Sequence, residues 1–112
     1  MGGWTDVDKA DNFAPGDARL VDVDDTMIAV FNIAGEYFAL EDVCTHDGSA
    51  ILGSGVDLTE LIADDELTCP HHGAKFCIRN GEALAPPAYE PITSFPVRVE
   101  NGMVQVRDPR MA

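Results

Sequence analysis

Two short stretches of this chain combine cysteine with histidine. Cys44 and His46 stand two positions apart, and Cys69 and His72 stand three positions apart. Each stretch therefore offers one thiolate and one imidazole, and both groups bind iron and zinc. Such a set predicts a metal centre. If the centre is a two-iron, two-sulfide cluster, its chemistry is one-electron transfer.

The way the ligands are paired separates two candidate metals. Zinc sites also use two Cys and two His, but zinc fingers usually pair Cys with Cys and His with His. Here each pair is mixed, and Gly48 and Gly73 follow closely. The mixed pairs favour a cluster with one iron on two thiolates and the other on two imidazoles, and a structural zinc module is the alternative. We expect both glycines to let backbone N–H groups turn toward the sulfides.

Two neighbouring residues could compete for the role of ligand. Three cysteines do not suit a disulfide framework, and two of them are already assigned to the metal. We expect the third, Cys77, to be a small buried apolar side chain. We expect His71 to be exposed or hydrogen-bonded and not to be a ligand.

The chain is strongly acidic. It has 112 residues and a formal net charge of -13, and between Leu20 and Ala74 it has twelve acidic residues but no Lys or Arg. This charge disfavours nucleic acid and anionic membranes as partners. The first residues do not resemble a signal peptide, and no apolar run approaches the roughly 20 residues of a membrane span. We therefore expect a cytoplasmic monomer with a single domain over residues 1–112.

Alternating apolar and polar side chains predict an all-β fold. Residues 94–107 alternate around Asn101-Gly102, which predicts a hairpin with a type I′ turn. Further strands are predicted at 20–23, 26–33 and 36–40. Residues 57–63 have helical spacing, with Asp57 as the N-cap. The sum predicts a β-sandwich or small barrel with the metal-binding loops at one end.

Acidic pairs in the turns do not suggest catalysis. Asp24-Asp25 and Glu41-Asp42 are predicted to be solvated turns, because nothing near them in the sequence supplies a nucleophile or an oxyanion donor. We therefore expect an electron carrier and not an enzyme.

The two metal-binding stretches resemble a known family. Cys44-Thr45-His46-Asp47-Gly48 and the run from Cys69 to Phe76 resemble the two cluster-binding boxes of Rieske proteins. Nearly the whole chain resembles the ferredoxin of bacterial aromatic-ring-hydroxylating dioxygenase systems, the biphenyl and toluene type in particular. The run from Lys75 to Gly81, followed by Pro86-Pro87, is similar to that subgroup's characteristic segment.

The resemblance implies both a fold and a function. It implies an antiparallel β-sandwich with a small cluster-binding subdomain at about residues 43–88. It implies one [2Fe-2S] cluster bound by Cys44, His46, Cys69 and His72. It also implies transfer of single electrons from a flavin-dependent ferredoxin reductase to a terminal Rieske oxygenase. A Rieske-like subunit of another redox complex, such as nitrite reductase, is the alternative.

Departures from the respiratory branch of the family predict a low reduction potential. That branch has an extra cysteine in each box, where this chain has Ser49 and His71, so the disulfide of that branch cannot form. It also has a Ser and a Tyr where Ala74 and Phe76 stand. Without those two hydroxyl donors the reduced cluster is less stabilised. We expect a potential at or below about -100 mV.

The spacing between the two boxes is longer than usual for the subgroup. Twenty-two residues separate His46 from Cys69, and the extra length falls near Gly55 to Glu66, which has five acidic residues and no base. The segment is either a solvated insertion or an acidic collar that steers a basic partner. Pro86-Pro87 is either a rigid connector or, by the resemblance, a loop packed over the cluster.

Overall fold

A computed structural model describes residues 3–71 and 73–111. The strands are β1 (Thr5–Lys9), β2 (Ala18–Val23), β3 (Thr26–Ile33), β4 (Glu36–Glu41), β5 (Ile62–Ala63), β6 (Glu66–Thr68), β7 (Lys75–Cys77), β8 (Ala83–Ala85), β9 (Ser94–Phe95), β10 (Val97–Glu100) and β11 (Met103–Val106). The helical turns are η1 (Ala10–Asn12), η2 (Leu52–Ser54), α1 (Leu58–Leu61) and η3 (Pro109–Met111). The predicted all-β fold is confirmed.

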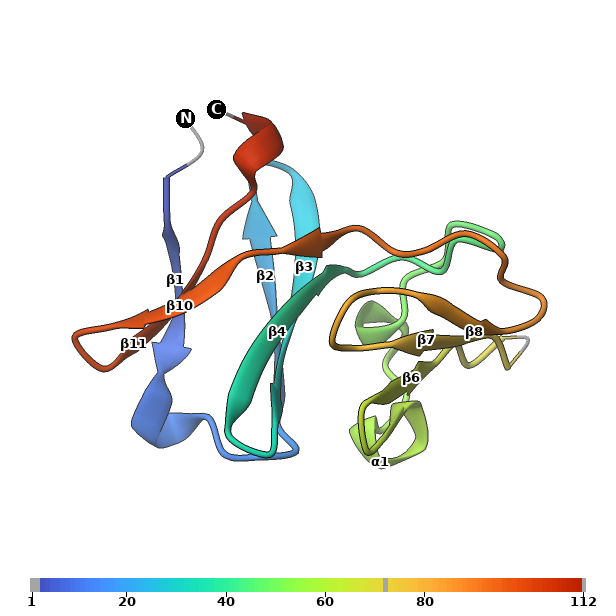
Figure 1. Cartoon of the computed structure of the whole chain (residues 1–112), viewed down its shortest axis with the longest axis horizontal. Helices are drawn as coiled ribbons and strands as arrows, with labels where there is room; N and C mark the ends of the chain where they lie inside the picture. Colours follow the sequence, from blue (N-terminus) through green and yellow to red (C-terminus); the bar gives the residue numbers. More distant parts are fainter. Residues whose placement is uncertain (1–2, 72, 112) are drawn as a thin grey trace.

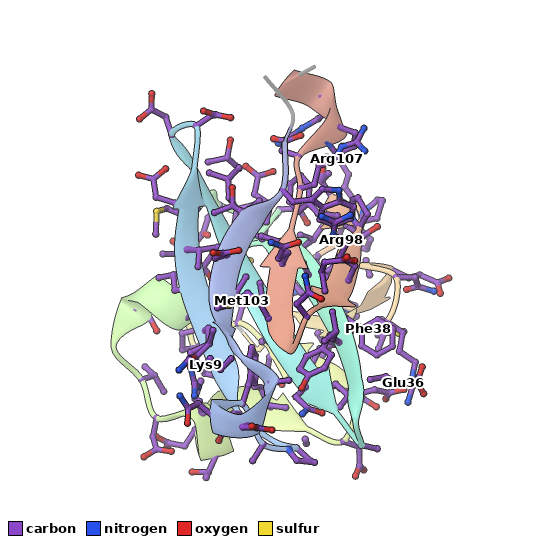
Figure 2. All side chains as sticks on the ribbon, turned by 90° about the vertical axis from the view of Figure 1, so that its left-hand side faces the viewer. Lys9, Glu36, Phe38, Arg98, Met103 and Arg107 are labelled. Carbon is purple, nitrogen blue, oxygen red and sulfur yellow. The ribbon has the colours of Figure 1, made fainter. Side chains whose placement is uncertain are left out.

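Three antiparallel sheets make up the described part of the chain. Their strand orders are β1-β11-β10, β2-β3-β4-β9 and β5-β6-β7-β8. Figure 1 shows the third sheet beside the other two, at the end of the molecule away from both termini. Figure 2 looks at the β1-β11-β10 sheet from outside, with Arg98, Met103 and Arg107 labelled. None of the helices described is long and apolar enough to cross a membrane.

Strand β3 is buried on both faces, which explains its continuous apolar run. Ile28 and Val30 pack with Val104 and Val106 of β11 in one cluster of buried side chains. Ala29 and Phe31, which alternate with them along the strand, pack into a second cluster toward the third sheet. Successive strand side chains point to opposite faces, so the central sheet supports a core on each side. The second of these cores contains Cys44 and Cys69.

The predicted hairpin over residues 94–107 is partly wrong. Its turn is confirmed, because Asn101 and Gly102 have φ values of 51° and 77° and join β10 to β11, as a type I′ turn requires. Residues 94–95, however, form β9 and pair with β4 in the other sheet. Pro96 lies at the crossing point, where a residue without an N–H group cannot continue a ladder. The chain therefore changes sheets at Pro96. In the strand that follows, β10, Val99 is 48% exposed.

The predicted helical turn is confirmed. Helix α1 covers Leu58–Leu61, and the Asp57 carboxylate accepts a hydrogen bond of 2.9 Å from the Thr59 N–H. The backbone N–H and the hydroxyl of Thr59 both donate to this carboxylate and hold the pKa of Asp57 below its ordinary value. Leu61 is buried beneath the turn. The helix leads directly into β5 and so joins the segment between the two boxes to the third sheet.

Candidate metal centre

The two cysteine-containing loops have the same backbone frame. In the first ligand loop, residues 44–49, the Cys44 N–H donates to the Ser49 carbonyl at 2.8 Å and the Cys44 carbonyl accepts from the Gly48 N–H at 2.7 Å. The second ligand loop, residues 69–74, repeats these bonds. Cys69 N–H donates to the Ala74 carbonyl at 2.8 Å, and Gly73 N–H donates to the Cys69 carbonyl at 3.1 Å. Each cysteine is therefore held through both of its backbone groups.

The glycines close these loops in a way that the sequence did not indicate. Gly48 and Gly73 have φ values of 78° and 73°, a region that favours glycine. Their N–H groups, however, donate to the Cys44 and Cys69 carbonyls. These bonds occupy the N–H groups of the two glycines themselves, and the expectation that the glycines let other backbone N–H groups of the loops turn toward the sulfides stays a prediction. The glycines shape the loop around each cysteine.

Both cysteine side chains are fully buried and share one cluster of apolar side chains. Cys44 and Cys69 each have 0% exposure, and both belong to the cluster that includes Ala74 and Phe76. His46, in contrast, is exposed. Two buried thiols beside an exposed imidazole suit a centre whose thiolate side faces the protein and whose imidazole side faces solvent.

The complete set of four ligands is not tested by the structure. His72 lies outside the described residues. Within the part of the chain that the structure describes, no three Cys, His, Asp or Glu side chains lie close enough together to hold a metal ion. The assignment of Cys44, His46, Cys69 and His72 therefore remains a prediction. His71 is exposed, as expected.

Asp42 organises the end of the first ligand loop, contrary to the prediction of a solvated turn. Its side chain is buried, with 8% exposure. One carboxylate oxygen accepts from the N–H groups of Ile51 and Leu52 at 3.1 and 2.7 Å, and the other accepts from Gly53 at 2.9 Å. A buried carboxylate needs such donors. No local sequence pattern indicates these contacts. Asp42 meets residues 51–53 only because the chain turns back after the first ligand loop.

A second contact missed by the sequence reasoning joins the first ligand loop to the segment after Pro86-Pro87. The Thr45 hydroxyl donates to the Glu90 carbonyl at 2.7 Å. Glu90 follows Tyr89, which is 81% exposed. The proline-containing segment is thus held next to residue 45, and Tyr89 projects from it into solvent.

Asp47 stabilises the turn of the first ligand loop. Its carboxylate accepts a hydrogen bond of 2.9 Å from the Ser49 N–H. This bond, with a further one from the Ser49 hydroxyl, holds the pKa of Asp47 below its ordinary value. The carboxylate is therefore ionised at neutral pH next to His46.

The prediction for Cys77 is wrong in one respect. Its side chain is partly exposed in β7 and not fully buried. Cys77 pairs across the ladder with Glu66 at the margin of the third sheet, whereas the next residue on either side, Phe76 or Ile78, is buried. The alternation of a strand places residue 77 on the outer face.

The segment between the boxes lies directly against the second ligand loop. Val56, Glu60 and Leu61 line one side of a hollow of about 430 Å³. Cys69 and Gly73 line the other side. Helix α1 is therefore a neighbour of the candidate metal centre and not a remote insertion.

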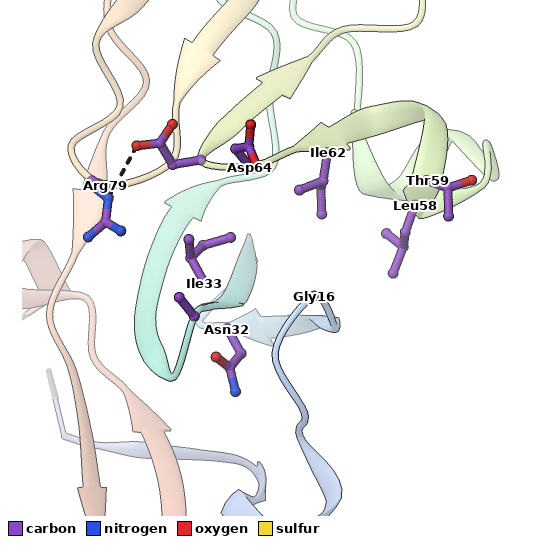
Figure 3. A pocket seen from close by; sticks show the side chains of 10 residues that line it. Gly16, Asn32, Ile33, Leu58, Thr59, Ile62, Asp64 and Arg79 are labelled. Carbon is purple, nitrogen blue, oxygen red and sulfur yellow. Dashed lines mark hydrogen bonds and ion pairs between the residues drawn. The ribbon is translucent and has the colours of Figure 1, made fainter.

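A larger cleft lies on the other side of α1. It measures about 590 Å³ and lies between the insertion and the turn after β3. Figure 3 shows Ile33, Leu58 and Ile62 around it, with Asp64 and Arg79 at its margin. Arg79 pairs with Asp65 at 3.2 Å, which Figure 3 marks with a dashed line. The cleft is apolar at its base and charged at its rim.

The segment from Asp57 to Glu66 remains net negative after pairing. In the described part of the chain its ion pairs run from Asp65 to Arg79 and from Glu66 to Lys75, the latter at 4.0 Å. Two cations thus face the five carboxylates of the segment. The result is a negative surface beside the second ligand loop.

The chemistry of the donors fits a two-iron cluster. Such a cluster takes thiolates and neutral imidazoles together, and the structure places two thiols in one buried cluster of side chains with an imidazole at the surface. The matching frames of the two loops provide each thiol with equivalent support.

Comparisons with known proteins agree with this site. The family model described as "Rieske [2Fe-2S] domain" matches residues 3–96. The chain is 35% identical over 109 residues to the biphenyl dioxygenase ferredoxin subunit of Pseudomonas sp. (strain KKS102), which covers 97% of the chain and 95% of that protein. It is 41% identical over 87 residues to the 3-phenylpropionate/cinnamic acid dioxygenase ferredoxin subunit of Escherichia coli (strain K12), covering 78% and 76% of the two chains.

A solved structure shares both the fold and part of the sequence. A chain in the complex of reduced oxygenase and oxidised ferredoxin of carbazole 1,9a-dioxygenase matches with a TM-score of 0.82 and 30% identity. The match covers 96% of this chain and 94% of that one. The mixed Cys and His loops, the three-sheet fold and the match over residues 3–96 lead to one conclusion: the chain belongs to the Rieske [2Fe-2S] domain family, and its cofactor is a [2Fe-2S] cluster.

Proposed function

We propose that the chain is the ferredoxin component of an aromatic-ring-hydroxylating dioxygenase system. In this role it accepts single electrons from a flavin-dependent reductase, passes them to a terminal Rieske oxygenase in the cytoplasm, and converts no substrate itself. The observation that carries the proposal is the 35% identity to a dioxygenase ferredoxin subunit over almost the full length of both chains. The pair of equivalent cysteine loops supports it.

The residues that hold the cofactor are proposed to be Cys44, His46, Cys69 and His72, in a unit over about residues 43–88. When bound, a cluster of this kind supplies a one-electron redox couple. The chain keeps Cys44 and Cys69 away from water and leaves His46 at the surface. The buried side therefore shields the thiolates, and the exposed imidazole provides the short route for an electron to a partner.

Ala74 and Phe76 support the predicted low potential. Both side chains are fully buried, and neither has a hydroxyl group. An apolar environment without donors disfavours an additional negative charge. We therefore retain a midpoint potential at or below about -100 mV as a prediction.

The surface around the ligand loops suits brief contact with a protein partner. Tyr89 is 81% exposed and Leu84 is 48% exposed on the segment that follows the second ligand loop. Exposed aromatic and aliphatic side chains of this kind commonly anchor protein interfaces. The negative surface beside α1 adds a charged rim, and we propose that it steers a basic patch of the partner.

Two experiments test the function in order. Purified protein should contain two iron atoms and two acid-labile sulfides per chain. A colourless protein with stoichiometric zinc would reject the cluster. Electron transfer should then be reconstituted by adding a flavin reductase and a terminal oxygenase of an aromatic dioxygenase system, with product formation as the readout. A cluster-containing protein that supports no candidate oxygenase would contradict the proposed role.

The steering proposal has a separate test. Glu60→Lys with Asp64→Lys should slow electron transfer at low salt by about threefold or more, with the difference disappearing near 1 M salt. Asp65 is left intact because it pairs with Arg79. The matched control is Asp11→Lys with Glu100→Lys, which reverses two exposed charges far from the ligand loops. Equal rates for both double variants would refute steering by this segment.

A further inference from the structure

The outer face of the β1-β11-β10 sheet carries two arginines beside the sole tryptophan of the sequence. The guanidinium carbon of Arg98 lies 4.3 Å from the centre of the Trp4 ring, and that of Arg107 lies 5.9 Å from it. Arg98 stands opposite Gln105 in the ladder, and Arg107 directly follows the end of β11, two positions after Gln105. Figure 2 shows Arg98 and Arg107 next to each other on this side of the molecule. The two cations therefore share one aromatic platform.

The hydrogen bonds around this platform leave donors unused. Arg98 Nε donates to the Gln105 side-chain oxygen at 2.8 Å, and the Gln105 amide donates to Asp6 at 2.7 Å. Arg107 Nε is buried and has no acceptor, and among the described residues it is the single buried side-chain nitrogen or oxygen in that state. A buried donor without an acceptor costs free energy, and in native proteins it commonly indicates a water or an ion.

The other arginines that stack on aromatic rings differ in one respect. Each of them also pairs with a carboxylate: Arg19 with Asp8, Arg79 with Asp65, and Arg110 with Asp108. Within the described part of the chain, no carboxylate forms an ion pair with Arg98 or Arg107. In a chain of net charge -13, two adjacent arginines without an acidic partner are an exception. They have the charge and the free donors that an external anion requires.

We propose that Arg98 and Arg107 bind an oxyanion, a carboxylate or a phosphate group, on the outer face of this sheet. A guanidinium group stacked on a ring keeps its in-plane N–H donors free, and its fork matches the paired oxygens of these anions. Trp4 holds both forks in place. Asp6 is already engaged by Gln105, so it does not fill the position. The site lies on a different sheet from the ligand loops and does not depend on the proposed function.

The test monitors the Arg107 Nε–H group, which has no acceptor in the structure. Holoprotein is titrated with inorganic phosphate at constant ionic strength, and the arginine Nε–H signals are recorded by ¹H–¹⁵N NMR together with Trp4 fluorescence. The Arg107 Nε–H signal should shift saturably, and the Trp4 emission should follow the same curve. Arg107→Gln should weaken the apparent affinity at least about tenfold, equivalent to about 1.4 kcal/mol. Arg79→Gln is the matched control, since Arg79 stacks on Phe38 but is already paired, and it should bind like the unsubstituted protein.

A parallel titration with acetate identifies the class of anion. A saturable response to acetate alone indicates that the site binds a carboxylate, such as an acidic protein segment would supply. A saturable response to phosphate alone indicates that it binds a phosphate group. Either result supports the site. Arg98→Gln provides a second variant in case Arg107→Gln fails to fold, and it should weaken binding in the same direction. The proposal is overturned if neither anion moves the Arg107 signal, if chloride produces the same response, or if Arg98→Gln binds with unchanged affinity.

Discussion

The two ligand loops have one backbone frame but different supports. In both loops the cysteine N–H donates five residues ahead and the cysteine carbonyl accepts from a glycine four residues ahead. The second ligand loop closes a hairpin, because Thr68 pairs with Lys75 where β6 meets β7. The first has no such ladder: Asp42 and Thr45 tie its surroundings to more distant backbone through their side chains.

This difference shows how one loop geometry can be reached by two routes. The second loop depends on backbone pairing, which most substitutions leave intact. The first depends on a few side chains, and a buried carboxylate is the main one. We therefore expect single substitutions near the first loop to have larger effects on stability than those near the second.

When the two loop sequences are aligned by their cysteines, the predicted histidine ligands, His46 and His72, do not occupy the same position. His46 and His71 both stand two residues after their cysteine, while Asp47 and His72 both stand three residues after it. Loop geometry therefore does not by itself select His72 over His71 as the ligand. That selection is a prediction from the family resemblance and has to be tested by substitution.

The largest effects are expected from the ligands themselves. Cys44→Ser, Cys69→Ser and His72→Gln should each reduce bound iron and acid-labile sulfide to near background, because every ligand is needed for the cluster. Cys77→Ser and His71→Gln should retain both at the level of the unsubstituted protein. Loss of the cluster in His71→Gln with retention in His72→Gln would reverse the assignment.

Asp42→Ala should be the most destabilising change that leaves all ligands in place. It removes the acceptor of three backbone donors, and we expect a loss of about 3 kcal/mol in the free energy of unfolding, measured by urea denaturation. Hydrogen exchange should accelerate at Ile51 and Leu52 but not at Gly73. Asp42→Asn keeps one carbonyl oxygen and should cost less. Equal acceleration in both ligand loops would show that the loops are not supported separately.

The next-largest effect is expected on the reduction potential. It is tested by substituting the last residue of each ligand loop, Ala74 and Ser49. Ala74→Ser should raise the midpoint potential by about 40 mV, because one added hydrogen bond of about 1 kcal/mol stabilises the reduced form of a one-electron couple by that amount. Ser49→Ala should leave it nearly unchanged, since the Ser49 hydroxyl is already bonded to Asp47. Redox titration of both variants measures their midpoint potentials. An unchanged potential in Ala74→Ser would contradict the role given to the missing hydroxyl.

The smallest effect is expected at Thr45. Thr45→Val removes the bond to the Glu90 carbonyl and should lower the free energy of unfolding by about 1 kcal/mol. Iron content should not change. If the variant instead loses iron, the proline-containing segment contributes to cluster retention and the first ligand loop depends on it more than we expect.

The sequence by itself determined the features that depend on neighbours along the chain. The Cys and His spacing, the short strand-forming runs of β2, β3 and β4, the turn at Asn101-Gly102 and the cap at Asp57 follow from local sequence and stereochemistry. The match over residues 3–96 agrees with the family that the two boxes indicated.

Tertiary structure decided the features that depend on residues far apart in the chain. It divided the first strand of the predicted hairpin at Pro96, because residues 94–95 pair with β4 and residues 97–100 pair with β11. It buried Asp42, because the chain returns from the first ligand loop with three N–H groups to satisfy. It also gathered Trp4, Arg98 and Arg107 from both ends of the sequence. Hydrogen-bond satisfaction and sheet pairing are properties of the whole fold, and local pattern does not contain them.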